Sequence, residues 1–154
     1  TSVIMVPNAS IKVNGSVSSL LPVWHGLFLM SLYGKVINSV IGSGVTIEKG
    51  AVVRDSIVMQ GTHIGACTVV DKAIIAENVT IGANAEVGFG DYAPSTYDPK
   101  VYQFELATIG ENSVIPDGVK IGRNTAIAGE TAIDDYPDGI LAGGNYIIKA
   151  GGVK

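Results

Sequence analysis

The sequence contains little cysteine and little charge, and each shortage excludes a class of protein. Cys67 is the only cysteine, so no disulfide can form within the chain, which is typical of a reducing compartment such as the cytoplasm. Charged residues make up 16% of the chain, the net charge is −4, and the lysines and arginines form no cluster. A nucleic-acid partner is therefore not expected, because proteins that bind nucleic acids carry a basic face.

The sequence also lacks a long uninterrupted apolar run. The longest, Leu20–Leu32, is broken by Pro22 and His25 and is shorter than the roughly 20 residues that span a bilayer. Only Lys12 precedes this run as a basic residue, and no small-residue cleavage site follows it, so neither a membrane partner nor a secretory signal is expected. The chain begins at Thr1 without a methionine, and we expect it to be a piece of a longer protein.

Glycine and β-branched aliphatic residues are abundant instead, and they follow a fixed order. The 20 glycines and the 47% hydrophobic content are typical of β structure. An aliphatic residue followed by glycine or a polar residue recurs every five or six positions, which is the hexapeptide repeat. These aliphatic residues are Ile41, Ile47, Val53, Val58, Ile64, Val70, Ile75, Ile81, Val87, Ile109, Ile115, Ile121, Ile127 and Ile133.

A second small or branched residue follows each aliphatic residue by four positions, as at Ala51, Ile57 and Ile74. The repeat predicts that both residues point inward, one large and one small on each face. Two six-residue steps and one five-residue step make a unit of 17 residues, the spacing of Val53 and Val70. The sequence therefore predicts an all-β, single-stranded parallel β-helix with three sides and 17–18 residues in each coil. Each coil buries the inward residues of the coils beside it.

Two segments depart from the repeat and set the predicted domain plan. We expect an irregular N-terminal coil or cap over residues 1–33, a β-helix over 34–148 and a C-terminal tail over 149–154. The apolar segment Leu21–Leu32 is interpreted as a flap over the first coil, with a contact surface for a partner as the alternative. A loop over 89–108 is inserted in the β-helix; packing against the prism and a functional role are both open for it.

The residues that usually carry catalysis or bind metal are sparse. His25 and His63 are the only histidines, which is too few for a three-histidine zinc site, and no nucleophile, base and acid follow a recognisable spacing. No glycine-rich phosphate-binding motif occurs either. We therefore expect no catalytic residue and no metal site.

Four basic residues are the candidates for binding an anionic effector. Arg54 and Lys72 are expected one coil apart near the five-residue corner, and Lys120 and Arg123 on adjacent corners of one coil. Solvent-exposed surface charge is the other interpretation of both pairs.

Two stretches carry a resemblance to a known family. The first is GKVINSVIGSGVTIEKGAVVRDSIVMQGTHIG (Gly34–Gly65), and the second is TIGENSVIPDGVKIGRN (Thr108–Asn124), followed by Asp135–Gly139. Over about residues 34–148 the chain resembles the C-terminal left-handed β-helix of bacterial glucose-1-phosphate adenylyltransferase, also called ADP-glucose pyrophosphorylase. The left-handed sense is implied by this resemblance and not by the period. Residues 1–33 match the family poorly.

The resemblance implies a parent nucleotidyltransferase of glycogen synthesis, which makes ADP-glucose and pyrophosphate from ATP and glucose 1-phosphate with Mg²⁺. In the family the chemistry belongs to an N-terminal domain, which is missing from this chain, so the chain alone is expected to be inactive and to hold no cofactor. The family's β-helix supports assembly of a tetramer and helps to form the allosteric effector site between domains. A homo-oligomer is therefore expected.

Two alternatives stay open at this point. A stand-alone hexapeptide acyltransferase would bind acyl-CoA between subunits and use a histidine as general base, with His63 and the 89–108 loop as its candidates. A purely structural interaction module is the third hypothesis.

Overall fold

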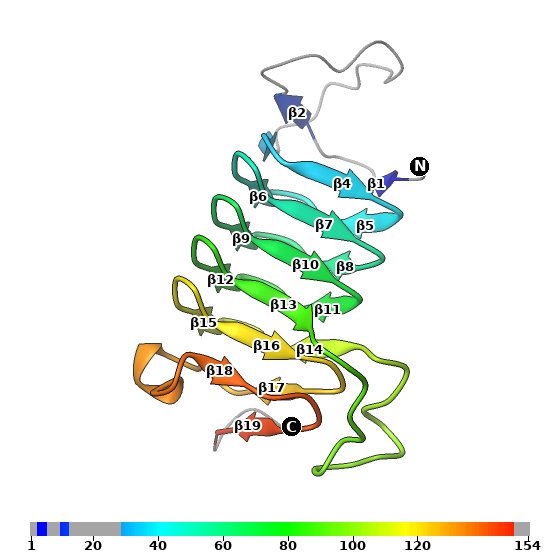
Figure 1. Cartoon of the computed structure of the whole chain (residues 1–154). Coiled ribbons are helices and arrows are strands. Elements are labelled where there is room, and N and C mark those ends of the chain that lie inside the picture. Colours follow the sequence, from blue (N-terminus) through cyan, green and yellow to red (C-terminus); the bar gives the residue numbers. More distant parts are fainter. Residues whose placement is uncertain (1–2, 6–9, 13–28, 150–154) are drawn as a thin grey trace.

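Short strands wind around a three-sided prism in the computed structural model, which describes residues 3–5, 10–12 and 29–149 (Figure 1). Most of the predicted N-terminal cap, including Trp24, lies outside the described residues, as do residues 150–154 of the predicted tail. Leu29–Leu32, the end of the predicted flap, is a strand of the prism.

The described strands form three sheets, one on each side of the prism, and neighbouring strands within each sheet run parallel. Sheet A contains, in spatial order, β1 (Val3–Met5), β5 (Ser39–Ile41), β8 (Ile57–Val58), β11 (Ala73–Ile75), β14 (Ala107–Ile109), β17 (Ala126–Ala128) and β19 (Tyr146–Ile148). Sheet B contains β2 (Ser10–Lys12), β3 (Leu29–Leu32), β6 (Thr46–Ile47), β9 (His63–Ile64), β12 (Thr80–Ile81) and β15 (Val114–Ile115). Sheet C contains β4 (Lys35–Ile37), β7 (Val52–Arg54), β10 (Val69–Asp71), β13 (Glu86–Phe89), β16 (Lys120–Gly122) and β18 (Ile140–Leu141).

Each sheet adds one ladder of aliphatic side chains to a single core. In sheet C the register joins Val53 to Val70 and Val70 to Val87, which confirms the 17-residue coil. In sheet B the register joins Ile64 to Ile47 and to Ile81, and all three are fully buried. The predicted all-β, three-sided β-helix of hexapeptide repeats is therefore confirmed.

At the corner between sheets C and A, part of the predicted set of inward residues is wrong. Ile57 is 41% exposed and Ile74 is partly exposed, although each follows an inward valine by four residues. The step here is five residues, so only two residues turn the corner and the inward position comes three residues after the valine. Ser56 and Ala73 occupy that position and are buried, while Ile57 and Ile74 face outward.

Two buried serines at this corner link successive coils by hydrogen bonds. The Ser39 hydroxyl accepts from the backbone N–H of Ser56 at 3.2 Å, and the Ser56 hydroxyl accepts from the N–H of Ala73 at 3.0 Å. Each hydroxyl also donates to a carbonyl of its own coil, Ile37 or Arg54, at 2.7 Å. A small polar residue is therefore tolerated at this inward position because its hydrogen bonds are satisfied.

A tyrosine closes the core near the C-terminal end, and here the hexapeptide prediction is wrong. Ile133, predicted to point inward, is 67% exposed and begins a 3-10 turn, η1 (Ile133–Asp135). The Asp135 carboxylate accepts from the N–H of Ala132 at 2.7 Å, which stabilises the turn and takes the chain off the strand path. Tyr136 is buried instead, and its hydroxyl donates to Thr131 Oγ1 at 3.0 Å. Burial raises the pKa of Tyr136 to about 12.

The predicted 89–108 insertion corresponds to the connection 90–106 between β13 and β14. It leaves the prism at the corner between sheets C and A and runs along the side of the last coils before returning to the stack (Figure 1). The side chain of Asn124 donates to the carbonyl of Ala93 at 2.7 Å, and both the N–H and the hydroxyl of Thr96 donate to the carbonyl of Gly144. The connection is therefore attached to two lower coils.

Candidate functional site

The corner between sheets C and A carries a column of polar side chains on successive coils. Asn38, Asp55 and Lys72 occupy equivalent positions, and all three have a left-handed backbone, with φ of 46°, 50° and 48°. The Asn38 amide donates to Asp55 Oδ1 at 2.6 Å. Asn and Asp adopt this conformation more readily than most residues, whereas Lys has no such preference. The left-handed backbone alone therefore does not explain why a lysine occupies position 72.

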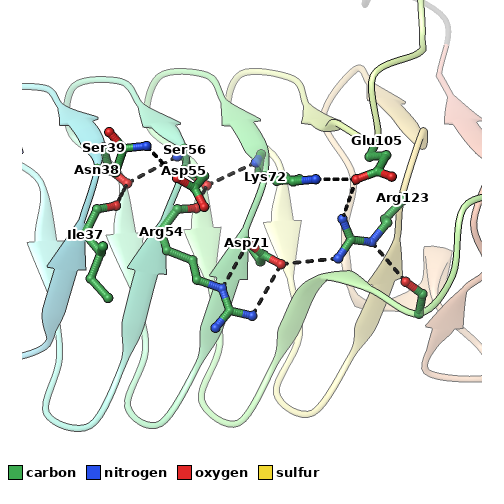
Figure 2. Close-up of polar contacts among 12 residues, drawn as sticks. Ile37, Asn38, Ser39, Arg54, Asp55, Ser56, Asp71, Lys72, Glu105 and Arg123 are labelled. Carbon is green, nitrogen blue, oxygen red and sulfur yellow. Dashed lines mark hydrogen bonds and ion pairs between the residues drawn. The ribbon is translucent and has the colours of Figure 1, made fainter. Parts of the chain in front are cut away.

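Asp71 is the first of two carboxylates that bring basic side chains together at this corner (Figure 2). Arg54 Nε lies 3.0 Å from Asp71 Oδ1, and Arg123 Nη2 lies 3.3 Å from Asp71 Oδ2. The Asp71 side chain is only 12% exposed, and a buried charge is costly unless it is paired. The two guanidinium groups supply that pairing. The hydrogen bond with Asp71, and then its charge, raise the pKa of Arg54.

Glu105, at the end of the 90–106 connection, is the second carboxylate. Its Oε2 atom receives both the Lys72 ammonium and Arg123 Nη1, the latter at 3.1 Å (Figure 2). Lys72, and to a smaller extent Arg123, hold the pKa of Glu105 below its ordinary value. Arg123 Nε also donates to the carbonyl of Gly90 at 2.9 Å. The Arg123 guanidinium therefore binds both ends of the connection, at Gly90 and Glu105, and also binds Asp71 of an earlier coil.

The structure brings together three of the four basic candidates and separates the fourth. Arg54, Lys72 and Arg123 belong to one network, which we call the corner cluster together with Asp71 and Glu105. Lys120 lies elsewhere on sheet C, with its ammonium 3.2 Å from Glu86 and 5.7 Å from the centre of the Phe89 ring.

Sequence reasoning missed both carboxylates of the corner cluster. The sequence does contain a pattern that could have identified Asp71: it lies 17 residues after Arg54, one full coil, and the two residues are paired in neighbouring strands. No such pattern identifies Glu105, because it lies in the connection where the repeat is interrupted.

His63 and Cys67 lie outside the corner cluster. His63 Nε2 lies 3.0 Å from Glu48 Oε1 on the neighbouring coil, and both side chains are about 40% exposed. Cys67 is exposed at a corner. Within residues 3–5, 10–12 and 29–149, no three His, Cys, Asp or Glu side chains are placed to hold a metal ion. No helix in this part of the chain is long and apolar enough to cross a membrane.

Comparison with known proteins agrees with the hexapeptide architecture. The family model described as "GlmU-like, C-terminal hexapeptide" matches residues 26–103, just over half of the chain. The glucose-1-phosphate adenylyltransferase of Lachnospira eligens is 60% identical over 120 residues, and that of Acetivibrio thermocellus 36% identical over 120 residues. Each alignment covers 78% of this chain and 28% of the relative. The enzyme of Thermotoga maritima is 45% identical over 117 residues, with 76% and 28% covered.

The chain thus spans about 28% of the length of these relatives and matches their C-terminal part. The predicted resemblance is confirmed, and these relatives support the nucleotidyltransferase hypothesis and not the acyltransferase alternative. The chain belongs to the family of GlmU-like C-terminal hexapeptide domains, in the form found in glucose-1-phosphate adenylyltransferases.

Proposed function

We propose that this chain serves as the C-terminal assembly and regulatory domain of a glucose-1-phosphate adenylyltransferase of glycogen synthesis. The observation that carries the proposal is the 60% identity over 120 residues to the Lachnospira eligens enzyme. Catalysis, with ATP, glucose 1-phosphate and Mg²⁺, belongs to the part of the relatives that this chain does not match. The partner of the β-helix is therefore an N-terminal catalytic domain, and the working compartment is the cytoplasm.

The chemistry of the described residues supports a role in assembly more than in catalysis. Each of the four basic candidates is paired with a carboxylate. Among the described residues, the side chains inside the prism are aliphatic or small and hydrogen-bonded, apart from Tyr136, whose hydroxyl is bonded to Thr131.

Exposed apolar side chains supply surfaces for a homo-oligomer, for which a tetramer is the expected form. Ile57 in β8 and Met59 just after it are 41% and 38% exposed, and Ile133 and Ile140 are 67% and 55% exposed near the C-terminal end. Apolar patches on a soluble protein are typical of contact sites.

The proposal predicts that the isolated chain is an inactive oligomer. Incubation with ATP, glucose 1-phosphate and Mg²⁺ is expected to release no pyrophosphate, and light scattering is expected to give a mass above that of one 15.9 kDa chain. The Lachnospira eligens enzyme under the same conditions is the positive control. Steady pyrophosphate release by the chain alone would contradict the assignment of catalysis to the part of the relatives that this chain does not match. A monomer at high concentration would contradict the assembly role.

A further inference from the structure

We propose that the 90–106 connection, which we call the strap, couples the corner cluster to the coil that contains β18 and β19, which we call the last coil. The strap and the last coil open and close as one unit, and Glu105 is the latch at the end of the strap. A change in the pairing of Glu105 therefore alters the C-terminal end of the β-helix. This inference goes beyond the proposed function and does not depend on it.

Two consecutive residues of the prism hold both ends of the strap. Arg123 donates through Nε to the carbonyl of Gly90 at 2.9 Å and through Nη1 to Glu105 Oε2 at 3.1 Å. The side-chain amide of Asn124, which is fully buried, accepts from the N–H of Glu105 at 2.8 Å and donates to the carbonyl of Ala93 at 2.7 Å. The strap is therefore closed at its base, and its two ends share the same anchors.

The middle of the strap packs on the last coil (Figure 1). The carbonyl of Gly144 accepts two hydrogen bonds from Thr96, one from the N–H at 2.8 Å and one from the hydroxyl at 3.0 Å. A Cβ atom added to Gly143 would lie only 3.2 Å from the Cβ of Ala93. Gly143 does not have a left-handed backbone, so this close packing, and not its conformation, explains why a glycine stands there.

The last coil receives little support from the rest of the stack. Among the described residues, β18 and β19 are the last strands of sheets C and A, and each pairs with a strand on one side only. Tyr146 of β19 is 47% exposed, and its ring centroid lies 4.8 Å from that of Tyr97 in the strap. A repeat with one neighbour opens at a lower free energy than an interior repeat. The strap is therefore expected to supply much of the stability of the last coil.

Arg123 links the latch to the last coil directly. Its guanidinium pairs with Glu105, and its backbone carbonyl accepts from the N–H of Gly144 at 2.8 Å. Glu105 also pairs with Lys72, which lies between β10 and β11 in the interior of the stack (Figure 2). Release of Glu105 therefore removes one of the contacts that fix Arg123, the residue to which the last coil is bonded.

The backbone at the latch is poised for release. Phe104 and Glu105 are consecutive non-glycine residues with left-handed φ of 65° and 66°. Each such residue is disfavoured, and a pair persists only where the surroundings hold it. The Phe104 side chain is 75% exposed and buries little apolar surface, so the polar contacts of Glu105 hold this backbone.

Amide hydrogen exchange of the full chain, followed residue by residue by NMR, tests the coupling. Glu105→Gln removes the charge of the latch and keeps the length of the side chain. Exchange is expected to be about three- to tenfold faster at Thr96 in the strap and at Gly144 and Lys149 in the last coil, whose N–H groups are all hydrogen-bonded. The N–H of Val69, in the interior of sheet C, should exchange at an unchanged rate.

Glu86→Gln is the matched control for Glu105→Gln. It removes an ion pair of the same kind, with the Lys120 ammonium at 3.2 Å, and Lys120 lies on the strand next to β18. The strap does not take part in this pair. Exchange at Thr96, Gly144 and Lys149 should therefore stay at the wild-type rate.

The reverse perturbation distinguishes coupling from a local effect, because coupling between two sites is reciprocal. Thr96→Val removes the hydroxyl that binds Gly144, and it is expected to speed exchange at the N–H of Glu105, at the far end of the strap. Thr80→Val, on the exposed face of sheet B, is its control and should leave Glu105 unchanged.

Three results would overturn the proposal. Faster exchange at Thr96 alone in Glu105→Gln would show that the strap and the last coil open separately. Unchanged exchange at all three amides, or at Glu105 in Thr96→Val, would show that the latch and the strap are not coupled. An equal increase at Val69 would show a general loss of stability in place of a coupled unit.

Discussion

Replacing Ile64 by alanine is expected to lower the free energy of unfolding by about 2–5 kcal/mol. Ile64 is fully buried in the sheet B ladder, between Ile47 of one coil and Ile81 of the next. Truncation leaves a cavity that both neighbouring coils line, and a stack of strands on three sides has little freedom to collapse around it. Chemical denaturation followed by circular dichroism at 25 °C measures the loss.

Ile57→Ala is the matched control for Ile64→Ala, because the same atoms are removed from the outer face of sheet A. Ile57 is 41% exposed, so the expected loss is below about 1 kcal/mol. The comparison also tests the corrected five-residue corner, since an unbroken four-residue offset would place Ile57 in the core. Equal losses in the two variants would contradict the described inward set.

Replacing Gly88 by alanine is expected to cost about 2–5 kcal/mol, the sum of a left-handed backbone and a steric clash. Gly88 has a φ of 83° and lies where the register between β13 and β16 shifts. A Cβ atom at this position would collide with the backbone carbonyl oxygen of Asp71. The clash cannot be relieved by a side-chain rotation, because both atoms belong to the backbone or are fixed to it.

Gly90→Ala separates the two contributions. Gly90 has a similar φ of 74°, but nothing lies within 4 Å of its added Cβ. Its loss should therefore be only the backbone cost of about 1–2 kcal/mol. Thermal and chemical unfolding of both variants provide the measurement, and a loss in Gly90→Ala as large as that in Gly88→Ala would show that the close approach to Asp71 is absent.

The stacked part of the fold could be predicted because its physics is periodic. A residue such as Val70 meets the same surroundings as Val53 and Val87, so one inward position predicts the others. The prediction failed where a local device interrupts the period. Ile57 faces outward because the corner is one residue shorter, and Ile133 is exposed because Tyr136 closes the core in its place.

The corner cluster could be predicted only in part, for the same reason. Arg54 and Lys72 were placed near one corner by the 17-residue spacing, and the same spacing would have placed Asp71 beside Arg54. Glu105 reaches Lys72 through the aperiodic connection, whose path depends on contacts such as that of Asn124 with Ala93. No spacing in the sequence encodes such a path, so the pairing of Arg123 with Glu105 emerges only from the structure.

A chimera tests the central claim most directly. The matched C-terminal part of the Lachnospira eligens glucose-1-phosphate adenylyltransferase is replaced by the corresponding residues of this chain, and pyrophosphate release from ATP and glucose 1-phosphate with Mg²⁺ is measured. If the chain is the assembly and regulatory domain of such an enzyme, the chimera keeps the oligomeric state of the parent and a rate within about tenfold of it, whereas the enzyme truncated before this part does not. A folded chimera of the parent's mass that releases no pyrophosphate would contradict the account.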